Sequence, residues 1–180
     1  MHIKKDWKNK KFTLTLVMAM TADGKIARNS NEFVDWTSRA DKRLFYDVSS
    51  CTGTVIMGKN TFNSFDGILE NRLNIVMTSE TSEINHENLI FYSGSPGSLI
   101  DMLVDMGISS AVLAGGAMIN YSFYKYGLID RLVLTISPYL FGTGLSLFSG
   151  EINEKLIFHN VEKIDEETIM IEYLFNKGNV

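Results

Sequence analysis

The sequence holds few of the residues that cross-link a fold or bind a metal. One cysteine among 180 residues, Cys51, excludes an internal disulfide and a cysteine-rich zinc site, and it favours a reducing compartment. The three histidines are scattered without the spacing of metal ligands. We therefore expect a cytoplasmic protein that holds no metal.

Long apolar runs and an excess of positive charge are also missing. No run approaches the ~20 residues of a membrane helix. Lysines precede the apolar run 12–20, but threonines interrupt that run, which argues against a signal peptide. Seventeen Lys+Arg against 21 Asp+Glu give a net charge of −4, which disfavours nucleic-acid binding. We expect a small-molecule substrate, and neither a membrane nor a nucleic acid as partner.

The composition that is present is typical of one globular domain. Hydrophobic residues make up 45% and charged residues 21% of the chain. The length fits one domain of about 100–200 residues, and no linker, repeat or low-complexity tract divides it. We predict a single domain over residues 1–180, with 1–11 as a candidate flexible end.

Hydrophobic patterning predicts an alternation of strands and helices. The predicted strands are 12–20, 54–57, 73–78, 89–92, 111–114, 131–137, 156–163 and 168–176. The predicted helices are 39–49, 97–106 and 117–126. Continuous apolar strands fit a parallel sheet that is buried on both faces. We predict an α/β fold with a mixed, mostly parallel sheet of about eight strands, flanked by helices and ending in an antiparallel hairpin.

Ligands of open α/β sheets bind where the parallel strands end. Gly58, Lys59 and Thr61 follow the strand 54–57, and close backbone approach, a cation and a hydroxyl together favour a phosphate. Counted from Gly53, the segment nearly matches an NTPase phosphate loop, but Asn60 replaces the hydroxyl that would hold magnesium. A plain strand-to-helix turn with a solvated lysine stays open as the alternative.

Two further junctions favour phosphate contacts. Gly115 and Gly116 open the predicted helix 117–126, whose first N–H groups suit an anion such as a pyrophosphate. A glycine pair needed only for tight packing is the alternative. Thr78 and Ser79 follow the third strand and are either a further contact or an ordinary polar loop.

The segment from Trp36 to Phe45 combines an aromatic residue with a helix start. Ser38 and Asp41 have the spacing of a capping box, so Asp41 has a purely structural interpretation. In the functional interpretation, Asp41 and Phe45 share one helix face, and a buried carboxylate grips a flat nitrogen heterocycle through paired hydrogen bonds. Both interpretations stay open.

Six segments in this order resemble the dihydrofolate reductase superfamily, which includes the reductase domain of the riboflavin-pathway deaminase-reductase. They are LVMAMTADGKIA, DWTSRADKRLF, GTVIMGKNTFNSF, LENRLNIVMTS, AVLAGGAMI and LIDRLVLTISPYLFGTG. The resemblance implies a dihydrofolate-reductase-like fold and NADPH-dependent hydride transfer to a pteridine-type ring, with dihydrofolate as the main expectation. The alternatives are reduction of a phosphoribosylamino pyrimidine in riboflavin biosynthesis and a non-catalytic NADPH-binding protein.

The resemblance also assigns roles to residues. It implies Asp41 and Trp36 as catalytic residues, with Asp41, Phe45, Phe65 and Thr135 around the substrate ring and Arg72 on a folate carboxylate. It implies that NADPH contacts Ala19, Ile26, Gly58, Lys59, Thr61, Thr78, Ser79, Gly115, Gly116, Ala117, Met118 and Ile119. Lys59 would favour NADPH over NADH by pairing with its extra phosphate.

Some residues depart from the dihydrofolate reductase pattern. Lys42 replaces an apolar residue, Glu70 a proline and Asn120 an aromatic residue. The segments DGKIA and PYLFGTG look like the riboflavin branch, whose substrate carries a phosphate that Lys42 or Arg72 could bind. The deaminase motifs H-x-E and P-C-x-x-C are missing, so only the reductase step applies. A homodimer through NYSFYKYG or SPYLFGTG stays open.

Overall fold

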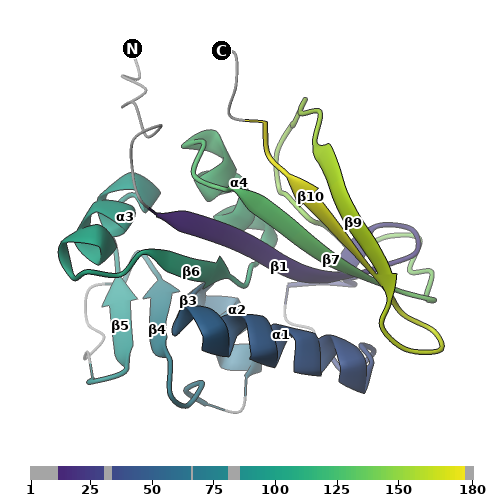
Figure 1. Cartoon of the computed structure of the whole chain (residues 1–180), viewed down its shortest axis with the longest axis horizontal. Coiled ribbons are helices and arrows are strands. Elements are labelled where there is room, and N and C mark those ends of the chain that lie inside the picture. Colours follow the sequence, from purple (N-terminus) through teal and green to yellow (C-terminus); the bar gives the residue numbers. More distant parts are fainter. Residues whose placement is uncertain (1–11, 31–33, 66, 81–85, 177–180) are drawn as a thin grey trace.

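The computed structural model describes residues 12–30, 34–65, 67–80 and 86–176, so the predicted flexible end 1–11 lies outside the described residues. The elements follow one another along the chain as shown in Figure 1. The strands are β1 (Thr13–Thr21), β2 (Lys25–Ala27), β3 (Thr54–Gly58), β4 (Leu73–Met77), β5 (Leu89–Tyr92), β6 (Ser110–Leu113), β7 (Arg131–Ser137), β8 (Leu145–Ser146), β9 (Ile157–Lys163) and β10 (Ile169–Leu174). The helices are α1 (Arg39–Thr52), α2 (Lys59–Ser64), α3 (Pro96–Asp105) and α4 (Ala117–Lys125).

Eight strands form the central sheet, in the order β5-β4-β3-β6-β1-β7-β10-β9. The pairs from β5 to β7 are parallel, and β10 runs antiparallel to both β7 and β9. The predicted α/β class, the mostly parallel sheet and the closing antiparallel hairpin are therefore confirmed. Strand β1 lies inside the sheet, with β6, β3, β4 and β5 on one side of it and β7, β10 and β9 on the other.

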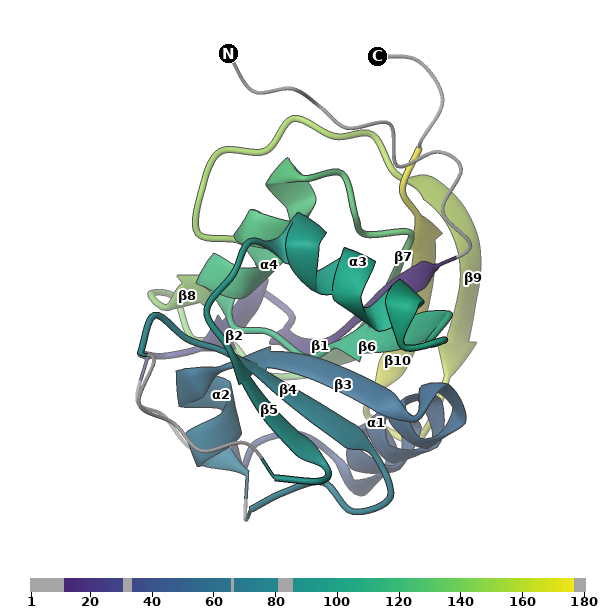
Figure 2. The same ribbon diagram turned by 90° about the vertical axis from the view of Figure 1, so that its left-hand side faces the viewer.

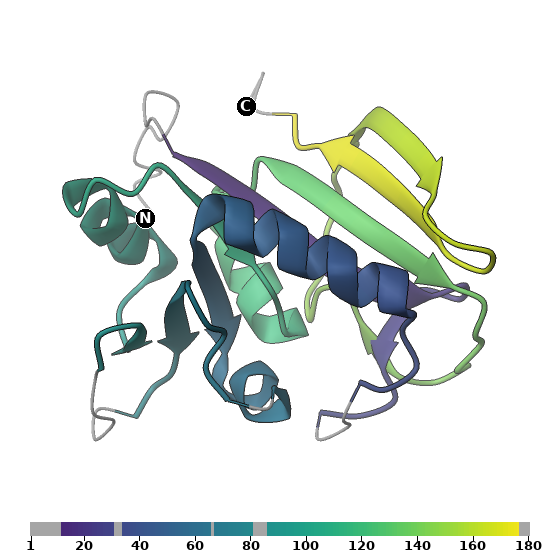
Figure 3. The same ribbon diagram turned by 60° about the horizontal axis from the view of Figure 1, so that its bottom comes forward.

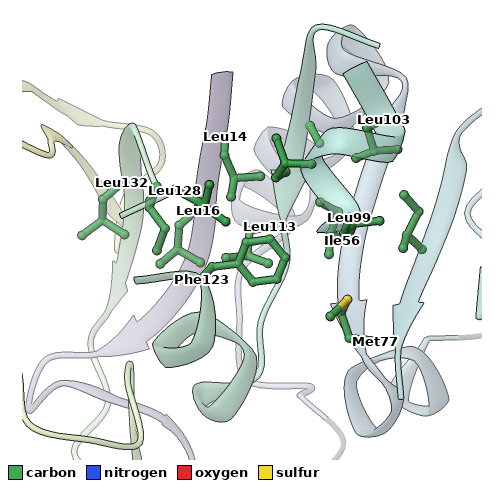
Figure 4. Close-up of a cluster of buried hydrophobic side chains, with 14 of the residues drawn as sticks. Leu14, Leu16, Ile56, Met77, Leu99, Leu103, Leu113, Phe123, Leu128 and Leu132 are labelled. Atoms are coloured by element: carbon green, nitrogen blue, oxygen red, sulfur yellow. The ribbon is translucent and has the colours of Figure 1, made fainter. Parts of the chain in front are cut away.

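Helices cover both faces of this sheet. Figures 1 and 2 show α3 and α4 on one face, with α1 and α2 on the other. Aliphatic side chains of alternate strand positions fill the layer under α3 and α4, where Leu99, Leu103 and Phe123 are completely buried (Figure 4). The opposite layer packs Val17, Val133 and their neighbours against the apolar face of α1. Burying each such side chain contributes about 1.5–3 kcal/mol, so the two layers fix where every strand ends.

Local sequence explains how the longer helices begin. The Ser38 hydroxyl accepts a hydrogen bond from the backbone N–H of Asp41 and caps α1. Ser95 caps α3 in the same way, with Pro96 in its first turn. Gly53 ends α1 with φ 67°, a left-handed conformation that glycine adopts without strain.

The predicted bounds differ from the observed ones by a few residues, and two strands were missed. Helix α1 continues to Thr52, beyond the predicted end at 49. The short strands β2 and β8 pair with each other as a separate ribbon, which no pattern predicted. Their two or three residues are too few for an alternating pattern to be recognised.

The turn of the last hairpin is tied to the start of α1. The Asp165 carboxylate accepts hydrogen bonds from the backbone N–H groups of Glu167 (2.9 Å) and Thr168 (2.7 Å). A hydrogen bond from the Ser38 side chain, with these backbone bonds, lowers the pKa of Asp165 to about 2. Figure 3 shows this turn beyond the N-terminal end of α1.

Removing the Asp165 charge should destabilise the protein at neutral pH and have little effect near pH 2. The lowered pKa means that the carboxylate stabilises the fold above its unfolded value of 3.8 and loses this contribution as the pH falls toward about 2. Asp165→Asn should therefore unfold at a lower urea concentration than the wild type at pH 7, with the difference vanishing near pH 2. Glu166→Gln, in the same turn, is the control. An equal effect of both substitutions at pH 7 would contradict the assignment.

Candidate active site

The structure brings the two predicted phosphate junctions together. The N–H of Gly58 donates to the carbonyl oxygen of Gly115 at 2.9 Å, so β3 and β6 end side by side. We call residues 114–117 the glycine turn. A Cβ at Gly58 would lie 2.9 Å from Cγ1 of Ile119, and one at Gly115 would lie 2.9 Å from Sδ of Met18. A methyl group at Gly58 would therefore overlap Ile119, and Gly115 has φ 97°, a conformation that favours glycine.

The glycine turn also leaves polar backbone groups available. Helix α4 has Gly116 at its N-cap, and no side chain caps its first N–H groups. Helices α1 and α3 have serine caps at the same position. The uncapped N–H groups of α4 carry the partial positive charge of a helix N-terminus and suit an anionic ligand. The packing and anion-binding interpretations of the glycine pair are therefore compatible.

A second group of polar side chains lies two strands away. The Thr135 hydroxyl donates a hydrogen bond to the Asp41 carboxylate, which joins β7 to the first turn of α1. Thr135 pairs with Ala19 of β1, and β1 pairs on its other side with β6, the strand that the glycine turn follows. Two strand spacings, about 10 Å, separate β6 from β7. A ligand of dinucleotide size can therefore reach from the glycine turn to the acid.

Asp41 lies in an environment that disfavours its charge. Burial is the largest influence and raises the pKa of Asp41, and the nearby Asp165 carboxylate raises it further. Hydrogen bonds from Thr135 and Thr37 and the charge of Lys42 lower it in part. Ser38 caps α1, but the Asp41 carboxylate itself accepts from Thr135 rather than serving only the helix end. A partly buried acid with a raised pKa is typical of functional sites.

Aromatic residues lie on both sides of the acid. The Phe45 and Phe65 rings stack with their centroids 5.9 Å apart and their planes at 17°. Trp36 packs edge-on against Tyr139 (6.2 Å) and Phe141 (5.3 Å). The Trp36 indole nitrogen is buried and has no hydrogen-bond partner among the described residues. The predicted ring contacts and the predicted role of Trp36 stay predictions.

Arg72 is buried and makes hydrogen bonds inside the fold. Only 6% of Arg72 is exposed, and its guanidinium donates to Ser49 Oγ (2.7 Å) and to the carbonyl oxygen of Glu70 (3.0 Å). Tyr46 covers it, with its ring centroid 4.9 Å away. Ser49 lies eight residues beyond Asp41, about 12 Å along the helix. Two donors of the guanidinium are thus used inside the fold, and the expected contact with a folate carboxylate stays a prediction.

The other predicted cofactor residues lie around the ends of β3 and β4. Thr61 Oγ1 is 3.6 Å from where a Gly116 Cβ would be, so α2 faces the glycine turn. Lys59 Nζ lies 4.6 Å from the centroid of Phe91 on β5. Thr78 follows β4 and accepts a hydrogen bond from Glu80, while Ser79 is exposed. Met118 is 75% exposed on the first turn of α4, beside Ala117 and Ile119.

Ile26 lies on β2, which long-range contacts hold in place. Ile26 is 7% exposed, and β2 pairs with β8. Asp23 precedes β2 and accepts hydrogen bonds from the N–H groups of Phe141 (3.1 Å) and Gly142 (2.6 Å), so it ties the loop after β1 to the loop after β7. This contact was missed, because a separation of more than a hundred residues leaves no local signal.

The chain matches the model of one protein family over most of its length. The match is to the RibD C-terminal domain and spans residues 12–170. The chain belongs to the RibD C-terminal domain family. The predicted membership of the dihydrofolate reductase superfamily, through its riboflavin-pathway branch, is thereby confirmed.

Individual relatives are more distant. The Bacillus subtilis (strain 168) protein YwjB is 23% identical over 167 residues, which cover 88% of this chain and 95% of YwjB. A pyrimidine reductase-like protein from Corynebacterium diphtheriae has a TM-score of 0.71 at 14% identity, covering 92% of each chain. The Thermotoga maritima diaminohydroxyphosphoribosylaminopyrimidine deaminase/5-amino-6-(5-phosphoribosylamino)uracil reductase has a TM-score of 0.75 at 20% identity. The match covers 92% of this chain and 57% of that bifunctional protein.

Neither a metal site nor a membrane-spanning helix is found in the part of the chain that the structure describes. No cluster of three or more histidine, cysteine, aspartate or glutamate side chains there is arranged to hold a metal ion. No helix there has the length and apolarity needed to cross a membrane.

The contact between Gly58 and Ile119 can be tested by stability measurements. Gly58→Ala should destabilise the protein by about 1–3 kcal/mol, because the new methyl group overlaps Cγ1 of Ile119. Ile119→Ala removes that atom, so the double variant should be more stable than the sum of the single effects by about 0.5–3 kcal/mol. Urea unfolding of all four proteins measures this coupling. Strictly additive effects would show that the two residues do not press against each other.

Proposed function

We propose that this protein is an NADPH-dependent reductase whose substrate is a phosphoribosylamino pyrimidine. Membership of the RibD C-terminal domain family supports the class of reaction. The name of the Thermotoga maritima relative supplies the substrate class, a 5-amino-6-(phosphoribosylamino)uracil. The observation that carries the proposal is the partly buried Asp41 carboxylate, held by Thr135 near the ends of β1 and β7.

The main expectation from the sequence, dihydrofolate, is corrected in favour of its alternative. The family match and the reductases of similar fold favour the riboflavin branch. Arg72, the residue expected to bind a folate carboxylate, donates to Ser49 and Glu70 inside the fold. Lys42 follows Asp41 and is exposed, and we assign to it the phosphate of the substrate.

The residues of the glycine turn fit a dinucleotide. Gly58, Gly115 and Gly116 place no Cβ between β3, β6 and α4, and the first N–H groups of α4 have no side-chain cap. Lys59 and Thr61 at the start of α2 would hold the cofactor's phosphates, with Thr78 and Ser79 after β4. Ala19 and Ile26 would contact its nicotinamide. When bound, NADPH supplies the hydride for reduction of a C=N carbon.

The side chains around Asp41 orient the substrate. The carboxylate accepts hydrogen bonds from ring N–H groups in one plane, while Thr135 fixes its rotation. Burial raises the pKa of Asp41. The hydride would add to the carbon of the C=N bond that the phosphoribosylamino group has once its sugar ring is open, and a proton from solvent would add to the nitrogen of that bond. Phe45 and Phe65 supply apolar surface for the ring.

A side-by-side turnover assay tests the proposal. Purified protein should oxidise NADPH, followed at 340 nm, when given 5-amino-6-(5-phosphoribosylamino)uracil, with little oxidation on dihydrofolate. Oxidation with dihydrofolate alone would restore the original expectation. Tight NADPH binding without turnover on either compound would support a non-catalytic nucleotide-binding protein instead.

Asp41→Asn should separate catalysis from stability. The amide keeps the shape but loses the acid, so kcat/KM should fall by at least about 100-fold. Because burial raises the pKa of Asp41, its charged form costs stability above pH 3.8, and the neutral amide removes this cost. The Tm at pH 7 should therefore stay the same or rise. A variant that turns over normally would return Asp41 to a structural role.

A further inference from the structure

Asn120 is a buried polar residue that the proposed reaction does not use. It lies on the first turn of α4 and is 0% exposed. Its amide nitrogen Nδ2 donates to the carbonyl oxygen of Leu147 at 2.8 Å. Its oxygen Oδ1 is buried without a partner among the described residues and lies 3.9 Å from where a Gly115 Cβ would be. A buried amide is costly unless its bonds serve the fold, so this contact calls for a reason.

The contact joins two sides of the candidate site. Leu147 directly follows β8, and β8 pairs with β2, which carries Ile26 (Figure 2). The Ser149 N–H donates to the carbonyl oxygen of Ala117 at 3.2 Å and makes a second bond from the same segment to α4. The segment 144–149 therefore runs from the Ile26 strand to the glycine turn.

Apolar packing also holds this segment, since Leu147 and Phe148 lie against the core and the Phe148 ring centroid is 5.7 Å from that of Tyr124. The hydrogen bond from Asn120 adds a directional contact to this packing. Strand β8 has two residues, too short to define its own register. A Cβ at Gly144 would lie 2.6 Å from the carbonyl oxygen of Ala27, so the segment approaches β2 closely at one end. At the other end, the backbone of the segment is hydrogen-bonded to the Asn120 side chain and to the Ala117 carbonyl oxygen. The amide nitrogen is committed to Leu147, which points Oδ1 toward the glycine turn.

We propose that Asn120 is a positioning residue that sets the spacing between the glycine turn and the Ile26 strand by holding Leu147 to the first turn of α4. This inference rests on the proposed function, in which the glycine turn takes the phosphates of a dinucleotide and Ile26 contacts its nicotinamide. A ligand that spans both sides binds best when their spacing is fixed in advance, because less ordering is needed on binding. Asn120 thus acts on cofactor affinity without touching the cofactor.

Two substitutions remove the contact in different ways. Asn120→Asp keeps the shape and removes both Nδ2 donors, whereas Asn120→Leu fills the space without adding a charge. The matched control is Asn74→Asp, because Asn74 is also 0% exposed and its Nδ2 also donates to backbone carbonyl oxygens. Asn74 lies where β4 begins, away from the carboxyl ends of the strands. The control separates loss of a buried amide in general from loss of this particular contact.

Hydrogen–deuterium exchange of the free protein reads the link without any cofactor. Both Asn120 variants should exchange at least about tenfold faster than the wild type in peptides covering 144–149 and 25–27, since the carbonyl oxygen of Leu147 loses its hydrogen-bond donor. Asn74→Asp should change exchange around residues 69–74 and 88 instead. Exchange at 144–149 and 25–27 equal to that of the wild type in both Asn120 variants would overturn the inference.

Binding and kinetics then test the role in positioning. The Kd and KM for NADPH should rise about tenfold in both Asn120 variants, with kcat within about threefold of the wild type. NADPH binding equal to that of the wild type, despite faster exchange, would overturn the positioning role. A wild-type protein that binds NADPH but reduces neither candidate substrate would refute the proposed reaction, while the comparison of Kd values would still decide the role of Asn120.

Discussion

The hydrogen bond between Thr135 and Asp41 is the contact on which the arrangement of the site depends. It joins β7 to the first turn of α1 across 94 residues of chain, on the sheet face that α1 covers. The Ser38 cap fixes where α1 begins, and the apolar side chains Leu44 and Val48 fix its rotation against the sheet. These contacts hold the partly buried Asp41 carboxylate next to a hydrogen-bond donor, which offsets part of the cost of its desolvation.

At the glycine turn, the absence of side chains lets the backbone of β3, β6 and α4 pack closely. At Gly58 and Gly115 a methyl group would overlap Ile119 and Met18, so close packing and an accessible backbone have the same cause. Helix α4 can begin shortly after the carboxyl end of β6, and no side chain caps its first N–H groups. The parallel register then places Ala19 between these N–H groups and Thr135.

The sequence predicted the parts of the molecule that local patterns determine. Apolar runs located β3, β6 and the rest of the large sheet, and glycines after them marked the right junctions. Asp41 and Thr135 could be paired only through a family resemblance, because spacing says nothing about residues on different elements. The contact of Arg72 with Ser49 was missed for the same reason, since Ser49 lies on α1 and burial at a strand start leaves no pattern. The Asn120 link likewise spans 27 residues to a segment without periodicity.

Under the proposed function, the choice between the two candidate substrates depends on charged residues around the site rather than on Asp41 itself. An acid beside a hydroxyl can hold a pteridine or a pyrimidine equally well, because both present N–H groups in one plane. The two substrates differ beyond the ring, where one carries a carboxylate-bearing tail and the other a phosphate. Arg72 is used inside the fold, and Lys42, one residue from Asp41, is exposed. A phosphate close to the ring suits that placement better than a carboxylate farther along α1.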